Sequence, residues 1–88
     1  MLKVALLEDS HEVQGALRSL LSLIDQVQVV GAARDGASAL RLIGETAPDV
    51  VVLDVNLEGG ERGLDVLRLI GARHPHTAVI VLSNDGPP

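Results

Sequence analysis

The 88-residue chain contains no cysteine and no aromatic residue. Without cysteine, neither a disulfide framework nor a thiolate metal site can form, which agrees with a reducing compartment. Without phenylalanine, tyrosine or tryptophan, aliphatic side chains must fill the core, and hydrophobic residues make up 47% of the chain. We therefore expect a cytoplasmic protein whose single core is thin and built from aliphatic side chains.

Long apolar runs and basic clusters are missing as well. The longest uninterrupted apolar runs cover four to five residues, whereas a membrane-spanning helix needs roughly 20. No basic start with a cleavage site precedes them. Seven basic residues are scattered among twelve acidic ones, which gives a net charge of −5. We expect no membrane partner and no nucleic-acid binding through this chain.

Four short apolar runs have the length and composition of buried strands. The third run is continuous, as expected where a parallel sheet is covered on both faces. The predicted strands are Leu2–Leu7, Val27–Ala32, Val50–Leu53 and Thr77–Leu82.

The segments between these runs change to helical spacing. The first forms one apolar stripe of an α-helix, with Asp9 or Ser10 as its N-cap. A second helix opens at Asp35-Gly36 and cannot continue through Pro48, and a third ends near His74-Pro75. The apolar positions that mark the three helices are Val13, Ala16, Leu17, Leu20, Leu21 and Ile24; Ala39, Leu40 and Ile43; and Leu64, Val66, Leu67 and Ile70.

The resulting order β-α-β-α-β-α-β predicts a parallel sheet with right-handed crossovers. We expect one α/β domain over residues 1–88, with a flavodoxin-like, doubly wound sheet of about four strands and three helices. In strand order 2-1-3-4, the first and third strands are neighbours about 4.8 Å apart, at the point where the strand order reverses.

Carboxylates follow both strands at this point. Glu8 and Asp9 come after the first strand and Asp54 after the third. The carboxyl ends of these two strands open into one crevice, so the three side chains meet there. Carboxylates this close repel one another, and a hard divalent cation is the simplest relief. Mg²⁺ suits such a site, and an aspartate beside it can act as a nucleophile toward phosphorus. Ser83 adds a hydroxyl after the fourth strand.

Three segments together resemble the response-regulator receiver domain of two-component signalling. They are Leu6–Ser10, Val51–Leu57 and Val81–Asn84, and the resemblance extends from residue 2 to residue 85. An acidic pair, an aspartate and a hydroxyl stand at three strand ends in the family's order.

The resemblance implies a phosphoacceptor rather than an enzyme. Asp54 would accept a phosphoryl group from a sensor histidine kinase or phosphotransfer protein. Glu8, Asp9 and Asp54 would hold Mg²⁺ together with the backbone carbonyl of Asn56, and Ser83 would be the switch hydroxyl.

The chain departs from the family pattern in two places. The loop after Asp54 has Glu58 where a proline is usual and looks one residue longer. The family's phosphoryl-binding lysine and aromatic switch residue belong to a last helix-strand-helix segment, and this sequence ends before it. Lys3 cannot replace that lysine, because it lies at the opposite end of the first strand. We therefore expect a receiver domain truncated at its carboxyl end.

Ordinary structural roles stay open for these residues. Asp9 could form a capping box with Glu12, and Glu8 could be a solvated strand end. Asn56 suits a turn, and Ser83 begins a good turn sequence. Asp54 is hardest to explain in this way, because a carboxylate after four buried apolar residues incurs a desolvation cost on the order of a few kcal/mol.

Two functions share the predicted fold. One is the phosphoacceptor, and the alternative is a degenerate or truncated receiver that acts as a dimerising protein-interaction module without phosphorylation. Thr77–Leu82 would be a bare apolar edge, so we expect a homodimer, with domain swapping as one form. An aspartyl phosphatase is disfavoured because Asn56 stands where its second aspartate is needed. A nucleotide- or flavin-binding domain is disfavoured because no glycine loop follows the first strand.

Overall fold

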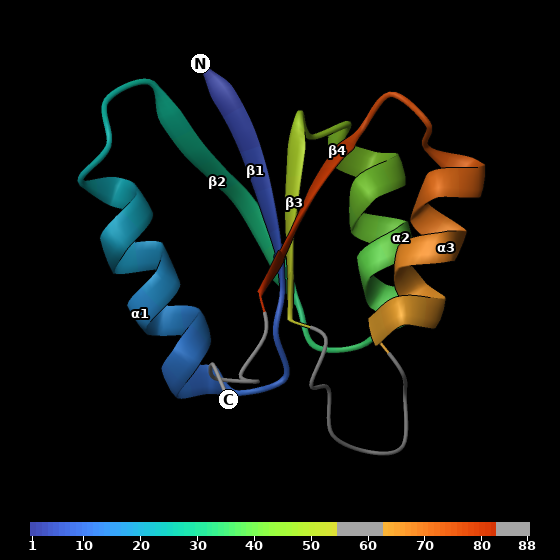
Figure 1. Cartoon of the computed structure of the whole chain (residues 1–88). Helices are drawn as coiled ribbons and strands as arrows, with labels where there is room; N and C mark the ends of the chain where they lie inside the picture. The colour runs from blue at the N-terminus through green and yellow to red at the C-terminus, as the bar shows by residue number, and fades with distance from the viewer. Residues whose placement is uncertain (55–62, 83–88) are drawn as a thin grey trace, which may run out of the picture.

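The computed structural model describes residues 1–54 and 63–82 of the chain, and Figure 1 shows their arrangement. The strand boundaries differ from the predicted ones by at most one residue. The elements are β1 (Leu2–Leu7), α1 (His11–Ser22), β2 (Val27–Ala33), α2 (Gly36–Thr46), β3 (Val50–Asp54), α3 (Gly63–Arg73) and β4 (Ala78–Leu82).

The four strands form one sheet of order β2-β1-β3-β4, and every neighbouring pair is parallel. The predicted flavodoxin-like, doubly wound sheet is confirmed. β1 and β3 lie side by side, with Leu7 opposite Leu53. The residues that follow these two leucines therefore lie at the same edge of the sheet and at the same level.

Helices cover the two faces of the sheet unequally, because α1 lies on one face and both α2 and α3 lie on the other (Figure 1). Since side chains alternate along a strand, β1 and β3 contribute to both faces. Of the described residues, nine are buried in the core under α2 and α3: Ala5, Leu7, Ala33, Ala39, Ile43, Val51, Leu53, Val66 and Ile70. The core under α1 holds three: Val4, Leu6 and Val52.

The apolar stripe predicted for α1 is only partly correct. No residue of α1 is fully buried, and the side chains that are partly buried are those of Gln14, Leu17 and Leu21. Val13 and Leu20 remain 42% and 62% exposed. The helix is therefore rotated from the predicted orientation, and its inward line begins with a polar residue.

A bulge in β2 changes which face its residues occupy. Val4 of β1 lies opposite Val29, but the next residue, Ala5, lies opposite Gly31. The skipped residue, Val30, packs with the core under α2 and α3. An ideal Cβ on Gly31 would also point toward α2, since it would lie 2.6 Å from Cδ1 of Leu42. One extra residue thus places two consecutive side-chain positions on the same face.

α2 ends in a left-handed residue. Ala47 has φ 46° and ψ 59°, and its N–H donates to the carbonyl oxygen of Ile43 at 2.9 Å. The Nζ atom of Lys3 donates to the carbonyl oxygen of Thr46 at 2.8 Å. Together with Pro48, these contacts end the helix as the sequence predicts.

Among the described residues, no helix combines the length and the apolar character needed to cross a membrane.

Candidate functional site

Three carboxylates converge where β1 and β3 end. Because Leu7 lies opposite Leu53, Glu8 and Asp54 follow at the same level of the sheet. One carboxylate oxygen from each of Glu8, Asp9 and Asp54 lies within 4.8 Å of the other two. The structure therefore brings together the acidic residues that the sequence analysis placed in one crevice.

Glu8 occupies an unusual environment for a carboxyl group. Its residue is 3% exposed, and it is the one buried polar or charged residue among those described. The pKa of Glu8 is raised to about 7, first by burial and then by side-chain hydrogen bonding with Asp54 and Asp9 and by the charge of Asp54. The backbone N–H of Ser10, which donates to Oε1 at 3.0 Å, opposes this rise. The alternative reading of Glu8 as a solvated strand end is wrong.

The alternative role of Asp9 as the N-cap of α1 is also wrong. The N-cap is Ser10, whose Oγ accepts a hydrogen bond from the N–H of Val13 at 3.3 Å. Asp9 is thereby left to place its carboxylate beside Glu8 and Asp54. Both Asp9 and Asp54 are partly exposed, so the cluster opens toward solvent.

The chemistry of these donors fits a hard cation. All three residues offer carboxylate oxygens, the ligand type that Mg²⁺ and Ca²⁺ prefer. Ionising Glu8 in its buried position is unfavourable, as its raised pKa indicates, and a divalent cation would offset that cost.

Two of the predicted site residues, Asn56 and Ser83, lie outside the described residues. The same holds for the loop around Glu58. Their predicted roles therefore stay predictions.

Two side chains that were not predicted as site residues contact the acidic pair. Nε2 of Gln14 donates to the carbonyl oxygen of Glu8 at 2.5 Å, and Nε of Arg34 donates to the carbonyl oxygen of Asp9 at 3.1 Å. A signal for Gln14 exists in the sequence, because it lies three residues before Leu17 and seven before Leu21 on the inward line of α1.

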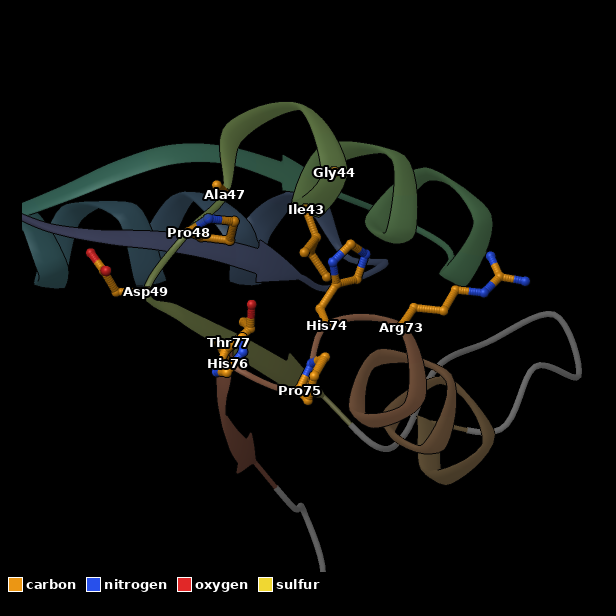
Figure 2. Close-up of a pocket in the computed structure, with 10 residues that line it drawn as sticks. All are labelled: Ile43, Gly44, Ala47, Pro48, Asp49, Arg73, His74, Pro75, His76 and Thr77. Atoms are coloured by element: carbon orange, nitrogen blue, oxygen red, sulfur yellow. The ribbon is translucent and has the colours of Figure 1, made fainter.

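A separate cleft lies at the opposite end of the sheet, between the segments that follow α2 and α3 (Figure 2). Its volume is about 440 Å³, and its lining includes Ile43, Pro48, Arg73, His74 and His76. Among the described residues, the one group of three or more possible metal ligands is the acidic cluster. None of the residues of that cluster lines the cleft, so the cleft is distinct from the candidate cation site.

The fold and the acidic cluster define a flavodoxin-like α/β domain with its site at the switch point of the sheet. The family of response regulator receiver domains matches residues 4–87 of the chain. The chain belongs to this family.

Individual relatives agree with this assignment. The chain is 38% identical over 85 residues to protein-glutamate methylesterase/protein-glutamine glutaminase 5 of Myxococcus xanthus, covering 97% of the chain and 24% of that protein. It is 35% identical to the response regulator GacA of Pseudomonas syringae, covering 94% of the chain and 38% of that protein. Among solved structures, the response regulator domain of Thermotoga maritima CheB matches with a TM-score of 0.86 and 30% identity, covering 94% of the chain and 60% of that domain.

The chain thus spans about a quarter to two-fifths of the length of these two curated relatives. Methylesterase activity is part of the name of the Myxococcus protein, of which this chain covers 24%.

Proposed function

We propose that this chain is a phosphoacceptor. Asp54 takes a phosphoryl group from a phosphohistidine of a sensor histidine kinase or phosphotransfer protein, in a Mg²⁺-dependent reaction. The observation that supports this most directly is the convergence of carboxylate oxygens from Glu8, Asp9 and Asp54 within 4.8 Å of one another. Membership of the receiver family supports the same conclusion.

Glu8, Asp9 and Asp54, together with the backbone carbonyl of Asn56, would hold the ion. When bound, Mg²⁺ supplies positive charge that offsets the charge on the phosphoryl oxygens during transfer. Glu8 is buried and Asp54 is partly exposed. This difference suits Glu8 to a purely ligating role and leaves Asp54 accessible to a phosphodonor.

The chemical step is a transfer between two nucleophiles. A carboxylate oxygen of Asp54 attacks phosphorus while the phosphorus–nitrogen bond to the donor imidazole breaks, and the electron pair of that bond leaves with the imidazole. The product is an acyl phosphate on Asp54. Ser83 would then donate its hydroxyl hydrogen to a phosphoryl oxygen, which links the phosphorylated state to a conformational shift.

Intact-mass measurement tests this proposal. The chain is incubated with Mg²⁺ and a small-molecule phosphodonor, with Asp54→Asn as the matched variant. We expect one phosphoryl increment on the wild type and none on Asp54→Asn or in the presence of a chelator. An increment that persists in Asp54→Asn, or a wild type that stays unmodified, would contradict it.

A second candidate function is a dimerising interaction module that works without phosphorylation. The exposure of β4 favours it, because Ile80, Val81 and Leu82 are 54%, 41% and 37% exposed. β4 is also an edge strand within the described sheet. An unmodified wild type that forms a stable dimer would support this function over the first.

A further inference from the structure

Gln14 is the one polar residue on the inward line of α1. The partly buried residues of this helix are Gln14, Leu17 and Leu21, and their spacing of three and four residues places them on one face. A side-chain amide in such a position costs free energy unless it is hydrogen-bonded.

The amide of Gln14 bridges the ends of two strands. Its Nε2 donates to the carbonyl oxygen of Glu8 at 2.5 Å and to the carbonyl oxygen of Ala33 at 3.3 Å. Because both partners are carbonyl oxygens, the amide must present its NH₂ group, which has two hydrogens to donate. The carbonyl of Ala33 also accepts the N–H of Glu8 at 3.0 Å. These hydrogen bonds therefore connect the end of β1 to the end of β2 at Glu8.

The second residue of the acidic pair is held in a similar way. Nε of Arg34 donates to the carbonyl oxygen of Asp9 at 3.1 Å. Both backbone carbonyls of the acidic pair thus accept a hydrogen bond from a side chain outside the cluster. One carboxylate oxygen of each residue of the pair lies within 4.8 Å of the other and of one from Asp54.

We propose that Gln14 is a positioning residue of the cation site, with Arg34 in a supporting role. The inference rests on the proposed function. When all three are ionised, as binding of a cation requires, carboxylates within 4.8 Å of one another repel. The chain segment that carries two of them would then relax outward without support. Gln14 holds that segment in place, so the carboxylates stay close enough to bind one ion. Mg²⁺ makes strict demands on ligand geometry, and loss of outer support typically lowers metal affinity about 10- to 100-fold.

Titration calorimetry with Mg²⁺ alone tests the role of Gln14. Gln14→Met keeps the length of the side chain and its neutral charge but removes both donors. We expect its dissociation constant for Mg²⁺ to rise about tenfold. Gln28→Met is the matched control, because Gln28 is an exposed residue of β2, opposite Lys3 near the amino end of the sheet. Its affinity should equal that of the wild type.

Thermal unfolding without Mg²⁺ separates positioning from a merely structural role. A structural role predicts that Gln14→Met unfolds at a lower temperature but that the folded protein binds Mg²⁺ as tightly as the wild type. Amide hydrogen exchange of Ser10 gives a second metal-free readout, since its N–H binds Oε1 of Glu8. We expect faster exchange in Gln14→Met and wild-type exchange in Gln28→Met.

Arg34→Met provides an independent test if Gln14→Met does not fold. Arg34 is exposed, so its replacement leaves the core intact. Loss of its positive charge alone would tighten Mg²⁺ binding, whereas loss of the bond to Asp9 weakens it. Because the charge of the exposed Arg34 is screened by solvent and salt, whereas its hydrogen bond acts directly on Asp9, we expect weaker binding. Tighter binding would contradict the supporting role of Arg34.

The outcomes distinguish this inference from the proposed function. A wild type that binds no Mg²⁺ overturns both. A wild type that binds Mg²⁺, with a folded Gln14→Met protein of the same affinity and the same Ser10 exchange rate, overturns the positioning role alone.

Discussion

Among single residues, Glu8 connects the site to the stability of the protein. Burial, together with the neighbouring Asp54 and Asp9, raises its pKa from 4.5 to about 7, so the folded protein holds this proton more tightly than the unfolded chain does. In metal-free protein, the stabilisation from protonated Glu8 is complete below about pH 4.5 and disappears as the pH rises through about 7. The lost free energy of unfolding is about 3 kcal/mol.

Denaturant unfolding of the wild type and Glu8→Gln, with a chelator present, measures this effect. Glutamine cannot ionise, so the variant lacks the pH dependence that Glu8 contributes. We expect the two proteins to have similar stability near pH 4 and the variant to be more stable by about 3 kcal/mol near pH 8. Acids outside the cluster of Glu8, Asp9 and Asp54 titrate in both proteins and cancel in the difference. If the free energy of unfolding changed with pH in the same way in both proteins, burial would not disfavour the ionised form of Glu8.

The sequence could predict which acids meet, but not how they are held. Strand order and the rule that parallel strands end at a common edge are sufficient to bring Glu8, Asp9 and Asp54 together. The amide of Gln14 could not be assigned, because its bonds to Glu8 and Ala33 depend on the rotation of α1 about its axis. That rotation depends on how the helix packs against the sheet. Hydrophobic spacing indicates which side of the helix is apolar but not its exact rotation.

For individual elements, the bulge in β2 has the clearest consequence. Gly31 follows the extra residue Val30 and faces Leu42 of α2. A Cβ at Gly31 would lie 2.6 Å from Cδ1 of Leu42, so the leucine would have to move within a core that it helps to fill. We expect Gly31→Ala to lower the free energy of unfolding by about 1 kcal/mol, the lower end of the cost of overpacking.

A double-mutant cycle checks this prediction by equilibrium unfolding. In a Leu42→Ala background the clashing atoms are absent, so Gly31→Ala should cost nothing or should stabilise the strand slightly. Gly44→Ala is a suitable comparison, since a Cβ at Gly44 would meet no neighbouring atom within 4 Å. Equal costs of Gly31→Ala in both backgrounds would rule out the contact with Leu42 as the cause.

The types and order of the elements were predictable because each has a distinct hydrophobic period and a clear stop. Asp35, predicted to open α2, is its N-cap, and Pro48 follows the end of the same helix. The bulge has one signal in the sequence, Gly31, because a glycine inside a strand often marks a bulge or a close backbone approach. The prediction missed it because the flanking Val29, Val30 and Ala32 suit a regular strand. The buried line of α1 was mispredicted because α1 covers its side of the sheet alone among the described helices, which leaves its apolar side chains without a second partner.

The two faces of the sheet are covered unequally, and this predicts that the protein associates with a second copy of itself. In the described part of the sheet, the face that carries Val52 is covered by α1, which packs chiefly against β2. Ile80 lies opposite Val52 in the register of β3 and β4 and is 54% exposed. β4 contains no charged residue and no proline, the features that usually protect an edge strand from pairing.

We therefore expect the chain to form a homodimer that buries β4 and the neighbouring apolar surface. Light scattering should give twice the monomer mass of 9.2 kDa. Ile80→Lys should shift the protein to monomer, because a charge in the middle of the buried strand would lose its hydration. Leu69→Lys is the matched control, since Leu69 is 43% exposed but lies on α3, which covers the opposite face. A wild type that stays monomeric at high concentration would show that the exposed strand is tolerated in solution, and the interaction-module function would lose its main support.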